Sequence, residues 1–171
     1  MPRVRMIEER EDTSPSQVEA FDHIAASRGG LMIRPFAAMI HRPQIARAAA
    51  DLGAVIRFES TLSDHDREVV ICTTAIERDC PFEWASHTPI ARKAGVAEAT
   101  LHSIEDGLEV EDATDAVLVE FTRELCRYGK VGEAAFERAW SRLDEEGTVE
   151  LAAIIGYYTM LALFMNACEA C

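Results

Sequence analysis

The chain has 171 residues and a mass of 18.9 kDa, a length typical of one domain whose core needs neither a disulfide nor a metal. Apolar residues make up 49% and charged residues 27%, a globular composition that excludes the intrinsically disordered class. The 17 basic and 30 acidic residues give a net charge of −13, which repels phosphate backbones, so no nucleic-acid partner is expected. An anionic small substrate stays compatible, because one pocket can carry its own cations.

The first residues are charged and contain no apolar run, so we expect no secretory signal and a cytoplasmic location. Residues 1–14 are predicted to be a tail, either disordered or packed as an arm on a neighbouring subunit. Residues 15–171 are predicted to form a single all-helical domain. The cysteines have no disulfide-framework spacing and are expected to be thiols in a reducing compartment; they are Cys72, Cys80, Cys126, Cys168 and Cys171.

From Pro15 onward, apolar residues recur with a helical period, and no segment alternates as a strand does. We expect residues 31–43 to be irregular, with a short turn over residues 36–40, and Pro89 to kink or break its helix. The inner face of the helix that begins at Pro43 is predicted to include Ile45, Leu52 and Ile56. The pattern therefore predicts the all-α class, a compact bundle of seven to nine helices. In chain order, the helices are expected before Gly29, from Pro43 to about Ile56, after the N-cap Ser63, from Pro81 to Gly95, from Ala97 to Ile104, from Ala113 to Tyr128, around Ala135 to Leu143, and from Thr148 to Asn166.

The last predicted helix is apolar on all sides, since residues 151–167 include no charged side chain. A membrane-spanning helix needs about 20 apolar residues, and this run is shorter and contains polar side chains. No membrane partner is therefore expected, and the helix is predicted to be buried within the bundle or in a subunit interface. Burial on every side requires more than one packing partner, which favours a homo-oligomer.

Four residues with chemically active side chains are predicted to lie close together. Cys80, Glu83 and His87 have i, i+3, i+7 spacing and share one helix face, while Glu68 lies on the preceding helix. A turn at Asp79 would place the two helices side by side. Taken singly, each residue has an ordinary structural role as a solvated charge, a core thiol or a surface pair. Their convergence favours a site.

Three sequence segments resemble the carboxymuconolactone decarboxylase family, whose superfamily includes the alkylhydroperoxidase D-like proteins. They are residues 62–71 (LSDHDREVVI), 80–87 (CPFEWASH) and 89–95 (PIARKAG). Residues 150–166 are similar to the family's last core helix, so that the resemblance extends over about residues 31–167. It implies an alkylhydroperoxidase D-like fold and a homo-oligomer.

The resemblance also implies roles for the four residues. The peroxidase branch uses a Cys-x-x-Cys pair, a histidine four residues later and an upstream glutamate in a proton relay. Cys80, His87 and Glu68 match the first cysteine, the histidine and the glutamate, but Glu83 occupies the position of the second cysteine. The redox dithiol is missing, and a thiol peroxidase needs a resolving thiol. Cys168 and Cys171 are either remote resolving thiols or simply terminal residues.

The favoured function is a cofactor-free lyase or isomerase acting on a carboxylated lactone or a related small acid. His87 would donate the proton, Glu68 would orient the imidazole, and Glu83 would be a second acid. Candidates for binding the substrate are Arg67 and Arg92, because both lie near the four residues in the sequence. Trp84 is a further candidate, because its aromatic side chain could exclude water from the site. No metal or organic cofactor is implied. The alternatives are a thiol-dependent alkylhydroperoxidase that uses Cys80 and a non-catalytic oligomeric member of the family.

Overall fold

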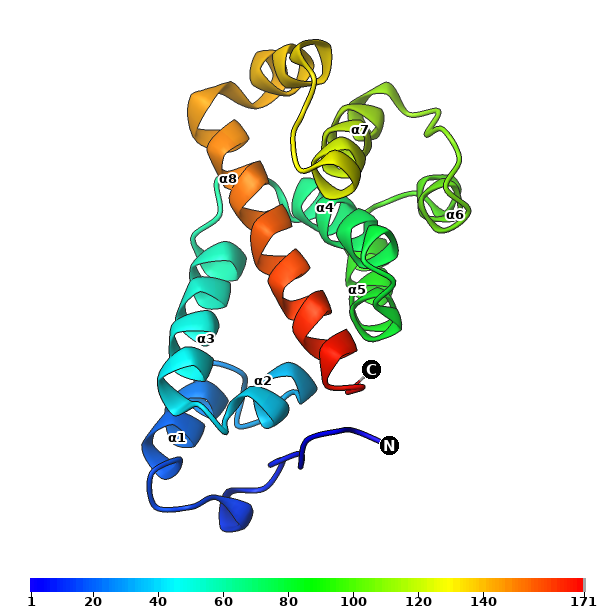
Figure 1. Cartoon of the computed structure of the whole chain (residues 1–171). Helices are drawn as coiled ribbons and strands as arrows, with labels where there is room; N and C mark the ends of the chain where they lie inside the picture. Colours follow the sequence, from blue (N-terminus) through cyan, green and yellow to red (C-terminus); the bar gives the residue numbers. More distant parts are fainter. Residues whose placement is uncertain (171) are drawn as a thin grey trace. The chain divides into compact units, whose positions relative to one another are not determined.

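The computed structural model describes residues 1–170, which contain eight α-helices, one 3-10 helix and no β-strand. The all-α class is therefore confirmed. The chain divides into two compact units, Met1–Glu59 with the residues from Phe164 onward, and Ser60–Leu163. Figure 1 shows the helices in chain order: η1 (Arg10–Asp12), α1 (Val18–Ala26), α2 (Arg34–Met39), α3 (Pro43–Phe58), α4 (Asp64–Glu77), α5 (Pro81–Lys93), α6 (Glu98–Glu105), α7 (Ala113–Tyr128) and α8 (Glu133–Ala167).

In the first unit, α3 packs against both α1 and α2, and η1 packs against α1. The N-terminal residues predicted as a tail make contacts within this unit. Ile7 is buried and its backbone N–H donates to the carbonyl of Ala37 at 2.9 Å, while Arg3 N–H donates to the carbonyl of Cys168 at 2.8 Å. A contact of this segment with a neighbouring subunit stays a prediction.

Two expectations for this unit are wrong. Residues 34–39 form the helix α2 instead of an irregular segment, because a proline in the first turn is compatible with a helix start. In α3, which begins at Pro43 as predicted, Ile45 and Leu52 are exposed, and the buried face consists of small residues and Ile56. The apolar period identified the helix but not which of two apolar faces is inside.

In the second unit, α4 is the central helix and packs against α5, α6 and α7. Ser63 is its N-cap as predicted, with Oγ accepting from the backbone N–H of Asp66 at 3.1 Å. The buried carboxylate of Asp115 on α7 accepts from Thr100 Oγ1 at 2.9 Å and lies 2.8 Å from His65 Nε2. One carboxylate thus connects α4, α6 and α7.

The turn between α4 and α5 is a Schellman motif. Asp79 adopts a left-handed conformation with φ of 48°, and Cys80 N–H donates to the carbonyl of Ala75 at 2.9 Å. Pro81 then starts α5, as predicted. α5 continues through Pro89 to Lys93, so a break at Pro89, one of the two expected outcomes, is wrong, and a kink there stays a prediction.

α8 consists of two helical segments with a break at Asp144, whose φ of 60° and ψ of −166° are non-helical. Asp144 caps the second segment: Oδ1 accepts from Gly147 N–H at 3.2 Å, and its carbonyl accepts from Thr148 Oγ1 at 2.6 Å. The two helices predicted around Leu143 and from Thr148 correspond to these segments. Within residues 1–170, only α8 is long and apolar enough to cross a membrane, but half of its apolar window is buried, as in a core helix.

Candidate functional site: a glutamate–histidine–glutamate cluster

The central contact of the site joins α4 to α5. His87 Nδ1 lies 2.7 Å from Glu68 Oε2, and the side chains are only 12% and 4% exposed. Both come from one helical hairpin, in which the Schellman turn sets the relative register of the two helices. A hydrogen on Nδ1, donated to the Glu68 carboxylate, leaves Nε2 as the free nitrogen of a neutral imidazole.

Glu83 lies on the other side of the imidazole. Its Oε2 is 3.5 Å from His87 Nε2, one helical turn away on α5, and its side chain is 5% exposed. Burial raises the pKa of the Glu83 carboxyl, the positive field of His87 opposes this rise, and the charge of Glu68 adds to it. The three side chains therefore form a buried cluster in which the pKa of the Glu83 carboxyl lies above its ordinary value.

Tyr158 on α8 completes the walls around the imidazole, and sequence reasoning missed it. Its ring packs edge-on against His87 with centroids 5.2 Å apart and an interplanar angle of 86°. Tyr157 packs against Tyr158 in the same T-shaped manner. The apolar run around Tyr158 carries no functional signal, although the adjacent Tyr157–Tyr158 pair could have marked it.

Cys72, Cys80 and Cys126 are buried. Cys80 is buried at the N-cap of α5, where its carbonyl accepts from Trp84 N–H at 3.2 Å. Cys72, one turn after Glu68 on α4, is fully buried, and burial together with the Glu68 charge raises the pKa of its thiol to about 12. Cys168 is half-buried at the other end of the chain. Cys171 lies outside the described residues, so the predicted C-terminal pair is not described.

The three predicted substrate-binding residues have different settings, and only Arg67 has a described contact with the cluster. Arg67 is buried; it donates to Asp64 Oδ1 at 2.8 Å, and its Nε lies 3.9 Å from Glu68 Oε1. Arg92 is half-exposed and forms a two-point ion pair with Glu98 on α6, with Nε to Oε1 at 2.6 Å. Trp84 is half-buried on α5.

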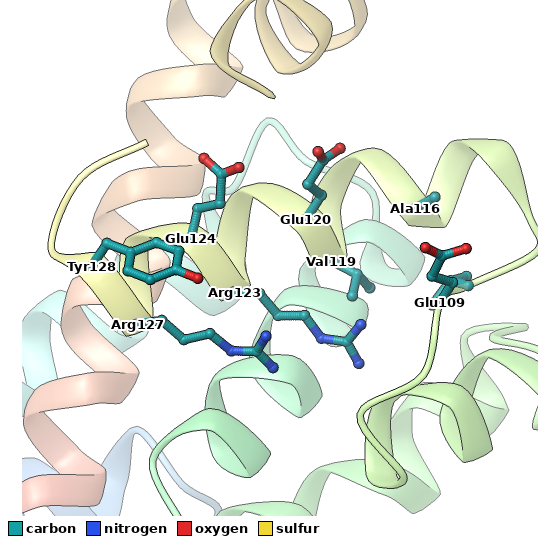
Figure 2. Close-up of a pocket in the computed structure, with 9 residues that line it drawn as sticks. Glu109, Ala116, Val119, Glu120, Arg123, Glu124, Arg127 and Tyr128 are labelled. Atoms are coloured by element: carbon teal, nitrogen blue, oxygen red, sulfur yellow. The ribbon is translucent and has the colours of Figure 1, made fainter. Parts of the chain in front are cut away.

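A separate groove of 430 Å³ lies along α7 and contains none of the predicted site residues. Figure 2 shows Arg123 and Arg127 on one side of α7 and Glu120 and Glu124 on the other. Arg127 forms a two-point ion pair with Glu77, and Arg123 donates to the backbone carbonyls of Leu108 and Ser103. Because both guanidinium groups are already engaged within the chain, the groove offers no free cation for an anionic ligand.

The cluster has the parts of a general acid–base site: a base oriented by a carboxylate, and a second acid whose pKa differs from that of an ordinary glutamate. Among residues 1–170, no group of three or more His, Cys, Asp or Glu side chains is arranged to hold a metal ion. The geometry thus brings together Glu68, Glu83 and His87 as the sequence predicts.

Comparison with known proteins bears on the fold and the family. The sequence profile described as "Carboxymuconolactone decarboxylase family" matches residues 43–121, which include α4 and α5. A solved structure from Ralstonia eutropha JMP134, described as an alkylhydroperoxidase AhpD core of an uncharacterized peroxidase-related protein, superimposes with a TM-score of 0.79. The identity is 18%, and the alignment covers 100% of this chain and 93% of that one. No curated protein sequence matches significantly.

The profile match spans both helices that supply the glutamate–histidine–glutamate cluster, and the structural likeness extends the same fold to the rest of the chain. Residues 43–121 of this chain are thus similar to the carboxymuconolactone decarboxylase family, and the chain has the alkylhydroperoxidase AhpD core fold.

Proposed function

We propose that the protein is a cofactor-free lyase or isomerase that transfers a proton to or from a carboxylated lactone or a related small acid. The observation that carries the proposal is the pair of contacts around one imidazole, Nδ1 to Glu68 at 2.7 Å and Nε2 to Glu83 at 3.5 Å. A histidine held at one nitrogen by a carboxylate has its other nitrogen free for proton transfer.

In the decarboxylation, the bond between the substrate carbon and its carboxylate breaks, and carbon dioxide leaves. The electron pair of that bond delocalises into the conjugated lactone carbonyl. The Glu83 acid gives its proton to His87 Nε2, Nε2 passes that proton to the substrate carbon to form the new C–H bond, and solvent returns one proton to the Glu83 carboxylate. Glu68 keeps the imidazole oriented and stabilises its charged form. In an isomerisation, the same groups would remove and return one proton.

The thiol peroxidase alternative is less well supported. Cys80 at a helix N-terminus is favourably placed for a thiolate, but it is buried, and Glu83 stands where the resolving thiol would be. A peroxidase cycle with Cys80 alone would need an external thiol to reduce the sulfenic acid. The proposal of a lyase or isomerase also includes a cytoplasmic location and a small-molecule substrate as partner.

The experiment is a parallel screen of carboxylated lactones and organic hydroperoxides. We expect release of carbon dioxide from a lactone without any reductant. Because general acid–base catalysis contributes about 10²–10⁴-fold, His87→Ala should lower kcat at least about 100-fold. The matched control is His102→Ala, since His102 is an exposed histidine on α6 outside the cluster. Full turnover by His87→Ala, or activity that requires a thiol reductant and is lost in Cys80→Ser, would refute the proposal.

A further inference from the structure

The side chain of His87 does not fix the plane of its own ring. The torsion that turns an imidazole about its bond to Cβ is broad, unlike the staggered torsions of aliphatic side chains. Within the cluster, Nδ1 lies 2.7 Å from Glu68 Oε2, but Nε2 lies 3.5 Å from Glu83 Oε2, beyond the usual hydrogen-bond distance. One short contact therefore holds one edge of the ring, and the direction of Nε2 depends on what packs against the imidazole.

Tyr158 supplies this packing. Its ring centroid lies 5.2 Å from that of His87, and the two ring planes make an angle of 86°. A perpendicular pair sets the positive edge of one ring against the negative face of the other, so the attraction weakens when either ring turns. The tyrosine is 4% exposed and the histidine side chain 12%, so the contact lies in the interior. It restrains the torsion that the histidine itself leaves free.

Tyr157 restrains Tyr158 in turn. The centroids of the two tyrosine rings are 5.2 Å apart and their planes make an angle of 89°. Tyr157 is also buried. His87, Tyr158 and Tyr157 thus form a series of three rings, each nearly perpendicular to the next. Since a tyrosine that turned freely would not hold the imidazole plane, the second contact makes the first one effective.

The helix that carries both tyrosines is well packed on either side of them. Four neighbouring apolar residues of α8 are fully or almost fully buried: Ile154, Ile155, Leu161 and Ala162. This part of α8 belongs to the same compact unit as α4 and α5, Ser60–Leu163. Side chains on a packed helix are positioned more precisely than side chains on a loop. α8 therefore provides a rigid base against which the imidazole of the hairpin is oriented.

We propose that Tyr158, supported by Tyr157, is a positioning residue that holds the imidazole plane of His87 so that Nε2 points toward Glu83. Proton transfer requires a donor and an acceptor that are aligned and within hydrogen-bond reach. A turned ring would lose the contact of Nδ1 with Glu68 and direct Nε2 away from Glu83. The kinetic consequence rests on the proposed function, whereas the orientation of the ring is measurable without a substrate.

The first test records long-range 1H–15N NMR spectra of the full chain at pH 8, with His87 assigned from the signals that His87→Gln removes. In wild type, we expect a single tautomer of His87, protonated at Nδ1. Tyr158→Leu removes the perpendicular ring, so the signals should become an average of two tautomers, and Tyr158→Phe should restore the single one.

The matched control is Tyr128→Leu, which removes an exposed tyrosine ring at the end of α7 and should leave the signals of His87 unchanged. A wild-type His87 without the single Nδ1-protonated tautomer would overturn the proposal. So would a folded Tyr158→Leu variant that keeps this tautomer.

Tyr157→Leu provides a second variant in case Tyr158→Leu does not fold. It leaves the contact of Tyr158 with His87 in place but removes the ring that restrains Tyr158. We therefore expect the second tautomer of His87 to appear here as well. If Tyr158→Leu is unfolded, a single Nδ1-protonated tautomer in Tyr157→Leu overturns the proposal.

Kinetics on a carboxylated lactone separate this inference from the proposed function. Because misplacing a catalytic group by about 1 Å can cost about 100-fold, Tyr158→Leu should lower kcat by about 10–100-fold with little change in KM. Tyr158→Phe should recover most of this loss. If the tautomers change as expected but wild type turns over no lactone, the positioning role stands and the proposed function fails. Lactone turnover by wild type together with a single tautomer in folded Tyr158→Leu would give the opposite result.

Discussion

His87 Nδ1 lies 2.7 Å from Glu68 Oε2, although the residues are 19 positions apart on different helices. The contact depends on the Schellman turn, which ends α4 at Glu77 and lets α5 begin at Pro81. Three residues reverse the chain between α4 and α5. This short turn sets the register of the two helices in which the side chains of Glu68 and His87 meet. The chemistry proposed above follows from this register.

The first prediction concerns the energy of the Glu68–His87 contact. Glu68→Leu leaves the Nδ1–H of a largely buried imidazole without its acceptor, and should lower the free energy of unfolding by about 1.5–3 kcal/mol. In a double-mutant cycle with His87→Phe, measured by urea unfolding, we expect a coupling energy of about 1–3 kcal/mol. The control cycle uses the half-exposed pair Glu120–Arg138, for which about 0–1 kcal/mol is expected. Equal coupling in the two cycles would contradict a special role for the buried contact.

The second prediction concerns pH and Glu83. Its raised pKa means that the folded protein holds this proton at pH values where the unfolded chain has released it. The contribution of Glu83 to the free energy of unfolding is therefore fully present below the ordinary glutamate pKa of about 4.3. It is lost as the pH rises through the raised pKa of the folded protein. Glu83→Gln removes this dependence, so its stability relative to wild type should increase with pH, by at most about 1.4 kcal/mol per pH unit. Urea unfolding between pH 5 and 8 measures the difference. If the free energies of unfolding of wild type and Glu83→Gln changed with pH in the same way, a raised pKa of Glu83 would be excluded.

The third prediction concerns the turn that aligns the site. Asp79 has a φ of 48°, in the left-handed region that glycine adopts without steric cost. Asp79→Gly should therefore be more stable than Asp79→Ala by about 1 kcal/mol in thermal or urea unfolding. At Asp106, which caps α6 with a φ of −84°, the order should reverse, because alanine is unstrained there. The same order at both positions would show that the conformation of the turn does not control its stability.

The fourth prediction concerns the thiols. Burial raises the pKa of Cys72 to about 12, so its thiol stays protonated at pH 8 in the folded protein, and burial also raises the pKa of Cys126. Iodoacetamide labelling followed by peptide mass spectrometry should modify the half-buried Cys168 at least tenfold faster than Cys72. In urea the two rates should become similar. Rapid labelling of Cys72 under native conditions would be inconsistent with its burial.

The sequence predicted the all-α class and most helix ends, because caps and stops have local signals such as Ser63, Pro81 and Gly129. It also predicted the convergence of Glu68, Glu83 and His87, since helical spacing and a short turn were sufficient. It did not predict the contact of Tyr158 with His87, which depends on how distant helices pack. It left open whether Pro89 breaks α5 or only kinks it, because the prolyl residue removes a helix hydrogen bond in either case.

The Schellman-linked pair α4 and α5 has a consequence for how the site assembles during folding. Glu68, Glu83 and His87 all belong to one continuous stretch of the chain, so closing the hairpin costs little loop entropy. Local contacts of this kind form faster than contacts between distant segments. Tyr158 is 71 positions beyond His87 and arrives only when α8 docks. We therefore expect Glu68, Glu83 and His87 to meet before Tyr158 packs against the imidazole.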